Sequence, residues 1–256
     1  MMGLSKNGKL KKIFKNGKAL ILAFDHAVEH GPHEYENIDL SPSRIGKIAY
    51  EGKVDGIIVH IGVGKMIKKL YPKLPIIVKL NMRNSLLPGE IQLQTITTTV
   101  KEAKKIGAIG IAYTIYFGSQ FESQMVENFA KVKEEADRYK MPIFGFAYPR
   151  SKKFSKYDPI AIRYAARIGA EIGFDVVKTY YTGDKESFSK IVKDCFVPLL
   201  IAGGPKIENE KEFLKMIEDA ISVGASGVAV GRNVWSRKDE DALYLLKEIR
   251  RIISQW

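Results

Sequence analysis

The chain has 256 residues, of which 45% are hydrophobic, and this is enough to bury the core of one large α/β domain or of two small ones. The 41 Lys and Arg residues against 29 Asp and Glu give a formal net charge of +12, which favours anionic partners such as phosphorylated metabolites. The cations are spread along the chain without a nucleic-acid-binding motif, so we expect no nucleic-acid partner.

The amino-terminal segment is basic, and the apolar stretch at residues 19–24 is too short for a secretory signal or a membrane span. We therefore expect a cytoplasmic protein that does not partner a membrane. The chain has a single cysteine, Cys195, which excludes intramolecular disulfides and is expected to be inert at a packed helix end. Since no linker or low-complexity tract divides the sequence, we expect one domain over residues 1–256, with residues 1–18 as a basic extension packed on or near it.

Eight short apolar runs recur along the chain, and each precedes a more polar segment of helical character. The runs cover residues 19–25, 56–61, 75–81, 108–115, 142–149, 175–181, 197–204 and 227–232. Residues 121–139, 160–172, 211–223 and 242–253 are amphipathic with helical spacing. Eight such repeats predict an α/β fold, a closed (β/α)8 TIM barrel, with a doubly wound sheet as the alternative.

Local signals mark where several of the predicted helices begin and end. Ser41 before Pro42 and Asp158 before Pro159 are typical helix starts, and glycines 107, 173 and 224 follow helical segments. Residues 81–98 break the strand and helix alternation and are expected to form a long loop over one face of the barrel.

Lys178 lies inside the sixth apolar run, where a lysine is unusual. Burial disfavours the ammonium, so its pKa is expected to fall and to leave free amine, the nucleophile that condenses with ketones. The alternatives are a lysine that reaches solvent from the strand end or one that pairs with a carboxylate such as Asp184. Lys79 is a second candidate amine, expected to form an ion pair or hydrogen bond and to disfavour protonation of Lys178 by repulsion.

Polar residues follow the apolar part of each predicted strand. In a barrel of parallel strands these carboxyl ends meet at one mouth, where active sites are built. The residues at these ends are Asp25, His26, His60, Lys79, Asn81, Tyr113, Tyr116, Tyr148, Arg150, Lys178, Tyr180, Gly203, Gly204, Gly231 and Arg232.

Glycine turns follow the seventh and eighth strands, the place where barrels commonly bind phosphate. Gly203 and Gly204 permit close approach of backbone N–H donors, and Gly231 and Arg232 add a second turn with a guanidinium. Together they predict a phosphate site.

Histidines 26, 30 and 33 are close together after the first strand, near Glu29 and Asp25. Nitrogen ligands so spaced can hold a divalent metal, which offers an alternative to amine chemistry. No recognised zinc motif accompanies them, and we expect hydrogen bonding to substrate or to Asp25 instead.

Six segments in consistent order resemble the archaeal-type class I fructose-bisphosphate aldolases. They are residues 24–32 (FDHAVEHGP), 113–119 (YTIYFGS), 147–150 (AYPR), 177–184 (VKTYYTGD), 202–206 (AGGPK) and 231–235 (GRNVW). The aminodideoxyheptulosonate synthases of aromatic amino-acid biosynthesis share the barrel and the Tyr-Pro-Arg and Lys-Thr segments. The pair Glu29 and His30 and the segment 113–119 favour the aldolase.

The resemblance implies a lyase of glycolysis and gluconeogenesis that reversibly cleaves fructose 1,6-bisphosphate to dihydroxyacetone phosphate and glyceraldehyde 3-phosphate. It implies a covalent imine with no cofactor or metal, and a homo-oligomer, often a decamer in this family.

The implied site residues are the Schiff-base lysine Lys178, the proton donor Tyr148, Asp25, His26 and His30 at the reacting carbons, Arg150 as a further substrate contact, and Ala202, Gly203, Gly204, Gly231 and Arg232 at one phosphate. The sequence departs from the family at Phe146, where tryptophan is common, and at Ala202, where serine is frequent. An aminodideoxyheptulosonate synthase or a metal-dependent aldolase remains the alternative.

Overall fold

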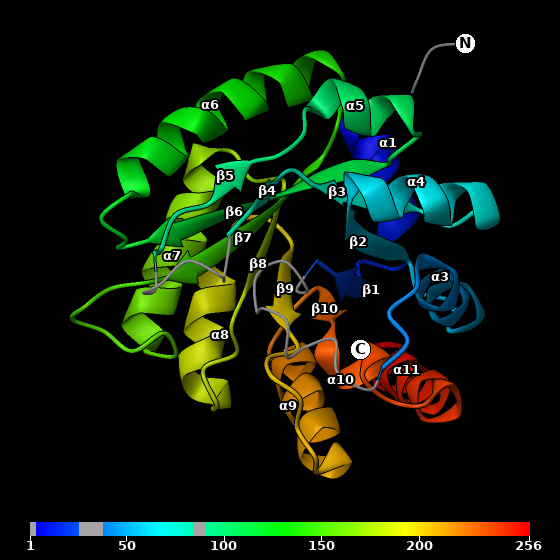
Figure 1. Ribbon diagram of the computed structural model, residues 1–256. Coiled ribbons are helices and arrows are strands. Elements are labelled where there is room, and N and C mark those ends of the chain that lie inside the picture. The colour runs from blue at the N-terminus through cyan, green and yellow to red at the C-terminus, as the bar shows by residue number, and fades with distance from the viewer. Residues whose placement is uncertain (1–3, 26–37, 84–90) are drawn as a thin grey trace.

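The computed structural model describes residues 4–25, 38–83 and 91–256, and within it eight parallel strands close into a barrel (Figure 1). Neighbours around the barrel follow the order β1, β10, β9, β8, β7, β6, β3, β2. Their bounds are β1 Ala19–Phe24, β2 Gly56–His60, β3 Ile76–Lys79, β6 Gly110–Phe117, β7 Ile143–Pro149, β8 Val176–Thr179, β9 Leu199–Ala202 and β10 Gly227–Val230. The predicted (β/α)8 barrel is confirmed.

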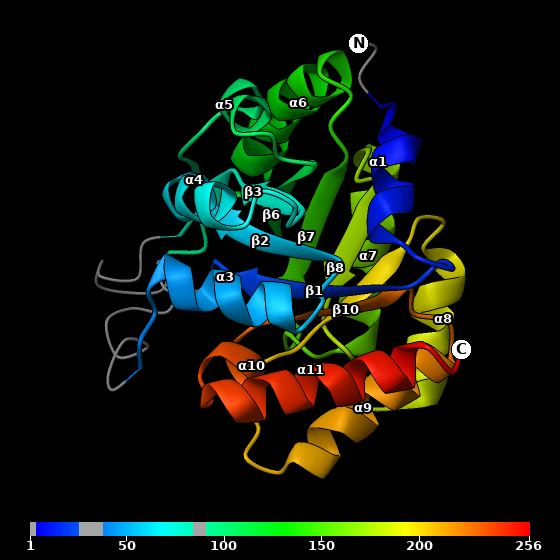
Figure 2. The ribbon, with the colours of Figure 1, turned by 90° about the vertical axis from the view of Figure 1, so that its right-hand side faces the viewer.

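The helices surround the barrel, as the two views in Figures 1 and 2 show. They are α1 Lys6–Ile13, α3 Pro42–Glu51, α4 Ile61–Leu70, α5 Val100–Lys105, α6 Glu122–Arg138, α7 Pro159–Ile172, α8 Lys185–Asp194, α9 Glu210–Ser222, α10 Arg232–Trp235 and α11 Asp239–Ile253. None of the helices in the described part of the chain has both the length and the apolar character needed to cross a bilayer.

The predicted helix boundaries have the expected local causes. The Asp158 carboxylate accepts hydrogen bonds from the backbone N–H groups of Ile160 and Ala161 at the start of α7, where Pro159 is the first helical residue. Gly173 ends α7 with φ of 111°, a left-handed conformation that favours glycine. These short-range signals fix where α7 begins and ends.

The basic amino-terminal segment contributes α1, which lies at the end of the barrel where β1 and β2 begin (Figure 2). Ile13 is buried there beside Gly56, the first residue of β2. The Lys6 ammonium pairs with Asp137 at 2.7 Å and with Asp175 at 3.0 Å. These contacts hold α1 at the opposite end from the residues that follow the strands.

Residues 81–98 differ from the predicted loop, because part of this segment pairs as a two-stranded antiparallel sheet. Its strands are β4 Asn81–Met82 and β5 Thr95–Ile96. The backbone N–H of Thr97 donates to the Leu80 carbonyl at 2.8 Å, which extends the chain beside the end of β3. Runs of two residues are too short to produce the alternation by which strands are recognised in a sequence.

Candidate active site

A cavity of about 250 Å³ opens at the carboxyl ends of the strands and collects most of the predicted site residues. It is lined by Asp25, Arg83, Tyr116, Phe146, Tyr148, Arg150, Lys156, Tyr157, Lys178, Tyr180, Ala202, Gly203, Gly204, Pro205, Ala229, Gly231 and Arg232. The strands β1, β6, β7, β8, β9 and β10, or the residues directly after them, therefore deliver side chains or backbone to one space, as parallel strands in a barrel require.

Lys178 lies on β8 and is 2% exposed, although it lines the cavity. Its Nζ is 4.0 Å from the centroid of the Phe146 ring on the neighbouring strand β7. This burial contradicts a lysine that reaches bulk solvent. Asp184, the other partner considered from sequence, instead caps α8 by accepting a hydrogen bond from the Ser187 N–H at 2.8 Å. The structure thus places a buried amine at the base of a cavity.

Lys79 is fully buried beside the same group of residues. Its ammonium donates to the Asn81 carbonyl at 2.9 Å and lies 3.8 Å from Oδ2 of Asp25, which is itself buried. The expected ion pair or hydrogen bond of Lys79 is confirmed. Its Nζ is also 5.3 Å from the Phe146 ring, so that ring lies near both lysines and partly occupies the space between the ends of β3 and β8.

An aromatic and cationic wall stands on one side of the cavity. Tyr148 and Tyr180 stack with their ring centroids 4.5 Å apart. Arg150 donates to the Tyr180 hydroxyl at 2.8 Å, and its guanidinium lies 4.9 Å from the Tyr116 ring centroid. Burial acts to lower the pKa of Arg150, but its interactions with Tyr180 and the neighbouring tyrosines outweigh burial and raise it. Arg150 is therefore a fixed cation at the cavity.

The glycine turns after β9 and β10 face the cavity together. Ala202, Gly203, Gly204, Gly231 and Arg232 all line it, as the predicted phosphate site requires. Gly204 has φ of 72°, which disfavours any residue with a side chain. A Cβ on Gly203 would come within 3.3 Å of the Val230 Cα, so glycine there allows the two turns to approach closely.

Four of the described residues at predicted strand ends do not line the cavity: Lys79, whose contacts are given above, and Tyr113, Asn81 and His60. Tyr113 is buried on the opposite face of β6, where its hydroxyl donates to the Met125 carbonyl of α6. Asn81 uses its side-chain amide to bond both the N–H and the carbonyl of Thr114. His60 precedes α4 and is likewise not at the cavity. Tyr113 therefore faces the helix side of β6 and not the mouth, whereas His60 ends β2 as expected but does not line the cavity.

His26 and His30, expected at the reacting carbons, lie outside the described residues, as do His33 and Glu29. The histidine cluster considered as a metal site is therefore also outside them. Within residues 4–25, 38–83 and 91–256, no group of three or more histidine, cysteine, aspartate or glutamate side chains is placed to hold a metal ion.

Three cavity residues with polar side chains were missed by the sequence reasoning: Arg83, Lys156 and Tyr157. Arg83 follows β4, and the other two lie in the connection between β7 and α7. The available signal was compositional, since that connection carries several lysines after Arg150. It gave no indication of which side chain turns inward.

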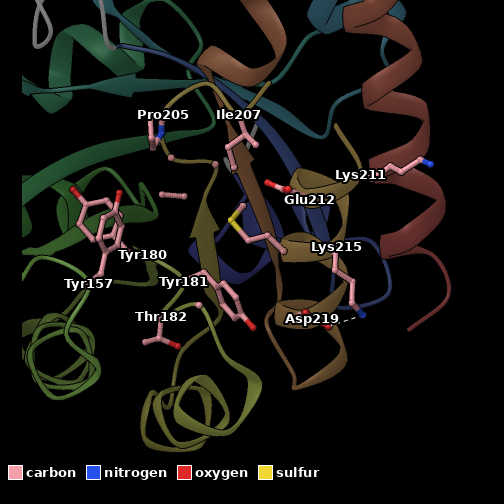
Figure 3. Close-up of a pocket in the computed structure, with 15 residues that line it drawn as sticks. Tyr157, Tyr180, Tyr181, Thr182, Pro205, Ile207, Lys211, Glu212, Lys215 and Asp219 are labelled. Carbon is pink, nitrogen blue, oxygen red and sulfur yellow. Dashed lines mark ion pairs between the residues drawn. The ribbon is translucent and has the colours of Figure 1, made fainter. Parts of the chain in front are cut away.

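A larger cavity of about 770 Å³ adjoins the first and lies outside the barrel strands (Figure 3). Tyr157 and Tyr180 lie on one side of it and Lys211 and Lys215 of α9 on the other, where Lys215 pairs with Asp219 at 2.9 Å. Residues 202–205 line both cavities. Lys178, Asp25 and Tyr148 line only the smaller one, so we place the chemistry there.

The chain matches known proteins over most of its length. A family model described as DeoC/LacD family aldolase covers residues 19–237. Over 237 residues the chain is 41% identical to the class 1 fructose-bisphosphate aldolase of Thermoproteus tenax, spanning 90% of this chain and 89% of that protein. It is 34% identical over 234 residues to 2-amino-3,7-dideoxy-D-threo-hept-6-ulosonate synthase 1 of Archaeoglobus fulgidus, spanning 91% of this chain and 85% of that protein.

A solved structure of an archaeal fructose-1,6-bisphosphate aldolase superposes with a TM-score of 0.90 at 38% identity, covering 97% of this chain and 99% of that chain. In that protein the catalytic lysine is covalently bound to the carbinolamine intermediate of the substrate. The fold, the buried lysine and the glycine turns thus occur together in a chain that resembles aldolases throughout.

Proposed function

Because the chain belongs to the DeoC/LacD aldolase family, we propose that it is a class I fructose-bisphosphate aldolase that forms a Schiff base through Lys178. It reversibly cleaves fructose 1,6-bisphosphate to dihydroxyacetone phosphate and glyceraldehyde 3-phosphate. The observation that carries this proposal is the buried amine of Lys178 in a cavity that is also lined by the glycine turns after β9 and β10.

The chemistry begins with the free amine of Lys178. Burial disfavours the charged form of a lysine in general, and Lys178 is buried. The amine attacks C2 of the open-chain ketose to give a carbinolamine, which loses water to form an iminium. The iminium accepts the electron pair of the C3–C4 bond when that bond breaks, and glyceraldehyde 3-phosphate leaves.

Two proton transfers complete the cleavage. The C4 hydroxyl loses its proton as the carbonyl of glyceraldehyde 3-phosphate forms, and C3 of the enamine then gains one. Tyr148 lines the cavity on β7, next to the strand that carries Lys178, and relays this proton: it takes up the proton that the C4 hydroxyl releases and then serves as the proton donor to C3. Asp25 lines the same cavity and assists this transfer. Hydrolysis of the resulting iminium releases dihydroxyacetone phosphate and restores the amine.

The substrate has a phosphate at each end, and the cavity offers cations on two sides. The turns at Gly204 and Gly231, with Arg232, hold one phosphate through backbone donors and a guanidinium. The ends of β9 and β3 lie four positions apart in the ring of eight strands, which places them on opposite sides. Arg83 follows β3 and β4, and together with Arg150 it contacts the second phosphate.

The second candidate function is the aminodideoxyheptulosonate synthase type, favoured by the relative from Archaeoglobus fulgidus. This function keeps Lys178 as the imine-forming residue and changes the donor and acceptor substrates of the aldol reaction. A metal-dependent aldolase is the third, and it predicts loss of activity with a chelator. The place in glycolysis and gluconeogenesis, the homo-oligomer and the cytoplasmic location stay predictions from the sequence.

Replacement of the two reacting side chains tests the proposal. Lys178→Met abolishes cleavage of fructose 1,6-bisphosphate and leaves binding of inorganic phosphate intact. Tyr148→Phe slows turnover by about 100-fold or more, the scale of general acid catalysis, yet still allows the covalent adduct. Lys69→Met, which changes an exposed lysine on α4, serves as the matched control with full activity. Substantial cleavage by the Lys178 variant would contradict the proposed function.

A further inference from the structure

Asn233 joins the two glycine turns although it does not line the cavity. It lies in α10 directly after Arg232, and its side chain is completely buried. Its amide nitrogen donates to the Gly203 carbonyl at 2.9 Å and to the Pro205 carbonyl at 2.8 Å. Its amide oxygen accepts from the Ile207 N–H at 2.8 Å. One side chain on the second turn therefore makes three hydrogen bonds to the segment after β9.

The Asn233 amide can make these three bonds in only one of its two orientations. Two of its partners are carbonyls, which need the amide nitrogen as donor, and the third is an N–H, which needs the amide oxygen. Arg237 reinforces the link by donating to the Asn233 carbonyl at 2.8 Å and to the Ile207 carbonyl at 3.1 Å. The two segments are thereby tied from behind the cavity wall.

The bond to Gly203 also sets the direction of a donor. The peptide that joins Gly203 to Gly204 is planar, so its N–H points away from its carbonyl. Because the carbonyl points to Asn233, the N–H of Gly204 is directed to the other side. Gly204 lines the cavity that holds Lys178 as well as the larger one beside it, and Asn233 lines neither, so the N–H of Gly204 is directed to the cavity side of the turn.

We propose that Asn233 is a positioning residue that holds the turns after β9 and β10 in the geometry that binds a substrate phosphate. The inference rests on the proposed aldolase function and deepens it. A loss of Asn233 weakens recognition of the phosphate group and leaves the chemistry at Lys178 intact, because the side chain touches neither the cavity nor the amine.

The test compares a phosphorylated ketone with its unphosphorylated counterpart. Borohydride trapping at Lys178 is measured against the concentration of dihydroxyacetone phosphate and of dihydroxyacetone, for the wild-type protein and for Asn233→Leu. The variant needs about 10- to 100-fold more dihydroxyacetone phosphate for half-maximal labelling, the scale of one or two hydrogen bonds to a charged group. The concentration of dihydroxyacetone needed changes less than about twofold, and inhibition by inorganic phosphate weakens in parallel with dihydroxyacetone phosphate.

A second variant and a control keep the test decisive if Asn233→Leu fails to fold. Arg237→Ala removes the bonds that reinforce the same link. It raises the half-maximal concentration of dihydroxyacetone phosphate by a smaller factor and leaves that of dihydroxyacetone unchanged. Asn209→Ala removes the cap of α9 from the same loop. It leaves the ratio of the two half-maximal ketone concentrations unchanged, because among the described residues the Asn209 side chain bonds to residues of its own segment.

The inference is overturned if folded variants lose labelling by both ketones in equal proportion, or if neither concentration changes. Failure of the wild-type protein to be labelled by dihydroxyacetone phosphate would instead overturn the proposed function on which the inference rests.

Discussion

The buried contact between Lys79 and Asp25 gives a quantitative prediction. Lys79 is completely buried, Asp25 is 4% exposed, and their charged atoms are 3.8 Å apart. Lys79→Met keeps the length of the side chain but removes the ammonium, together with its 2.9 Å hydrogen bond to the Asn81 carbonyl. Removal of one partner from a buried ion pair costs about 3–5 kcal/mol of the free energy of unfolding, because the other charge stays in low dielectric.

The assay is urea unfolding followed by circular dichroism, supported by thermal melting. For a chain of 256 residues each kcal/mol lowers Tm by about 2–4 °C, so Lys79→Met lowers Tm by roughly 6–20 °C. Asp25→Asn in the Lys79→Met background recovers part of this loss, with a coupling free energy of about 1–3 kcal/mol. Lys69→Met, an exposed change, leaves the free energy of unfolding within about 0.5 kcal/mol of the wild type. A Lys79→Met protein within about 1 kcal/mol of wild type, or strict additivity in the double variant, would refute the reasoning.

Three further predictions concern packing, pH and thiol reactivity. Gly145→Ala lowers the free energy of unfolding by about 2 kcal/mol or more in urea titrations, since a methyl there overlaps the Phe174 ring; an unchanged midpoint would contradict this packing. Lys6→Met costs about 0.5–1 kcal/mol near neutral pH. Burial acts to raise the pKa of Asp137, but hydrogen bonds from lysines including Lys6 outweigh burial and lower that pKa. The stability gained from the Lys6–Asp137 pair is therefore present above the unfolded pKa of Asp137 and is lost as pH falls through its folded pKa. The difference in the free energy of unfolding between Lys6→Met and wild type therefore shrinks in acid, and a constant difference across pH would contradict this prediction. Burial raises the pKa of the Cys195 thiol, so iodoacetamide labels it slowly in the native protein and quickly in urea, as mass spectrometry can measure; equal rates would contradict its burial.

Much of the fold could be predicted because its causes are local and periodic. The apolar runs and the start of α7 at Asp158 and Pro159 are visible in the sequence and correspond to the observed elements. The short strands β4 and β5 were missed, since pairing of two residues with two others depends on tertiary placement and leaves no pattern.

The site was only partly predictable, for two physical reasons. Successive side chains on a strand point to opposite faces, so Tyr113 and Tyr116, three residues apart, face opposite sides of β6. A polar residue near a strand end is therefore not always at the mouth. Lys156 and Tyr157 lie in a connection without any period, where the direction of a side chain is set by the packing of the whole molecule.

Asn233 shows a further limit of sequence reasoning. Its role depends on three backbone partners in a segment about thirty residues away, which no local spacing indicates. By contrast, Lys178 could be singled out, because a lysine within an apolar strand conflicts with the ordinary cost of burying a charge.

The most direct test of the account is borohydride trapping with dihydroxyacetone phosphate in the presence of a chelator, followed by mass mapping of the labelled peptide. We expect one adduct, on Lys178, and cleavage of fructose 1,6-bisphosphate that the chelator does not reduce. An adduct without cleavage would favour the synthase, and the absence of any adduct, or labelling of Lys79 in place of Lys178, would contradict the central claim.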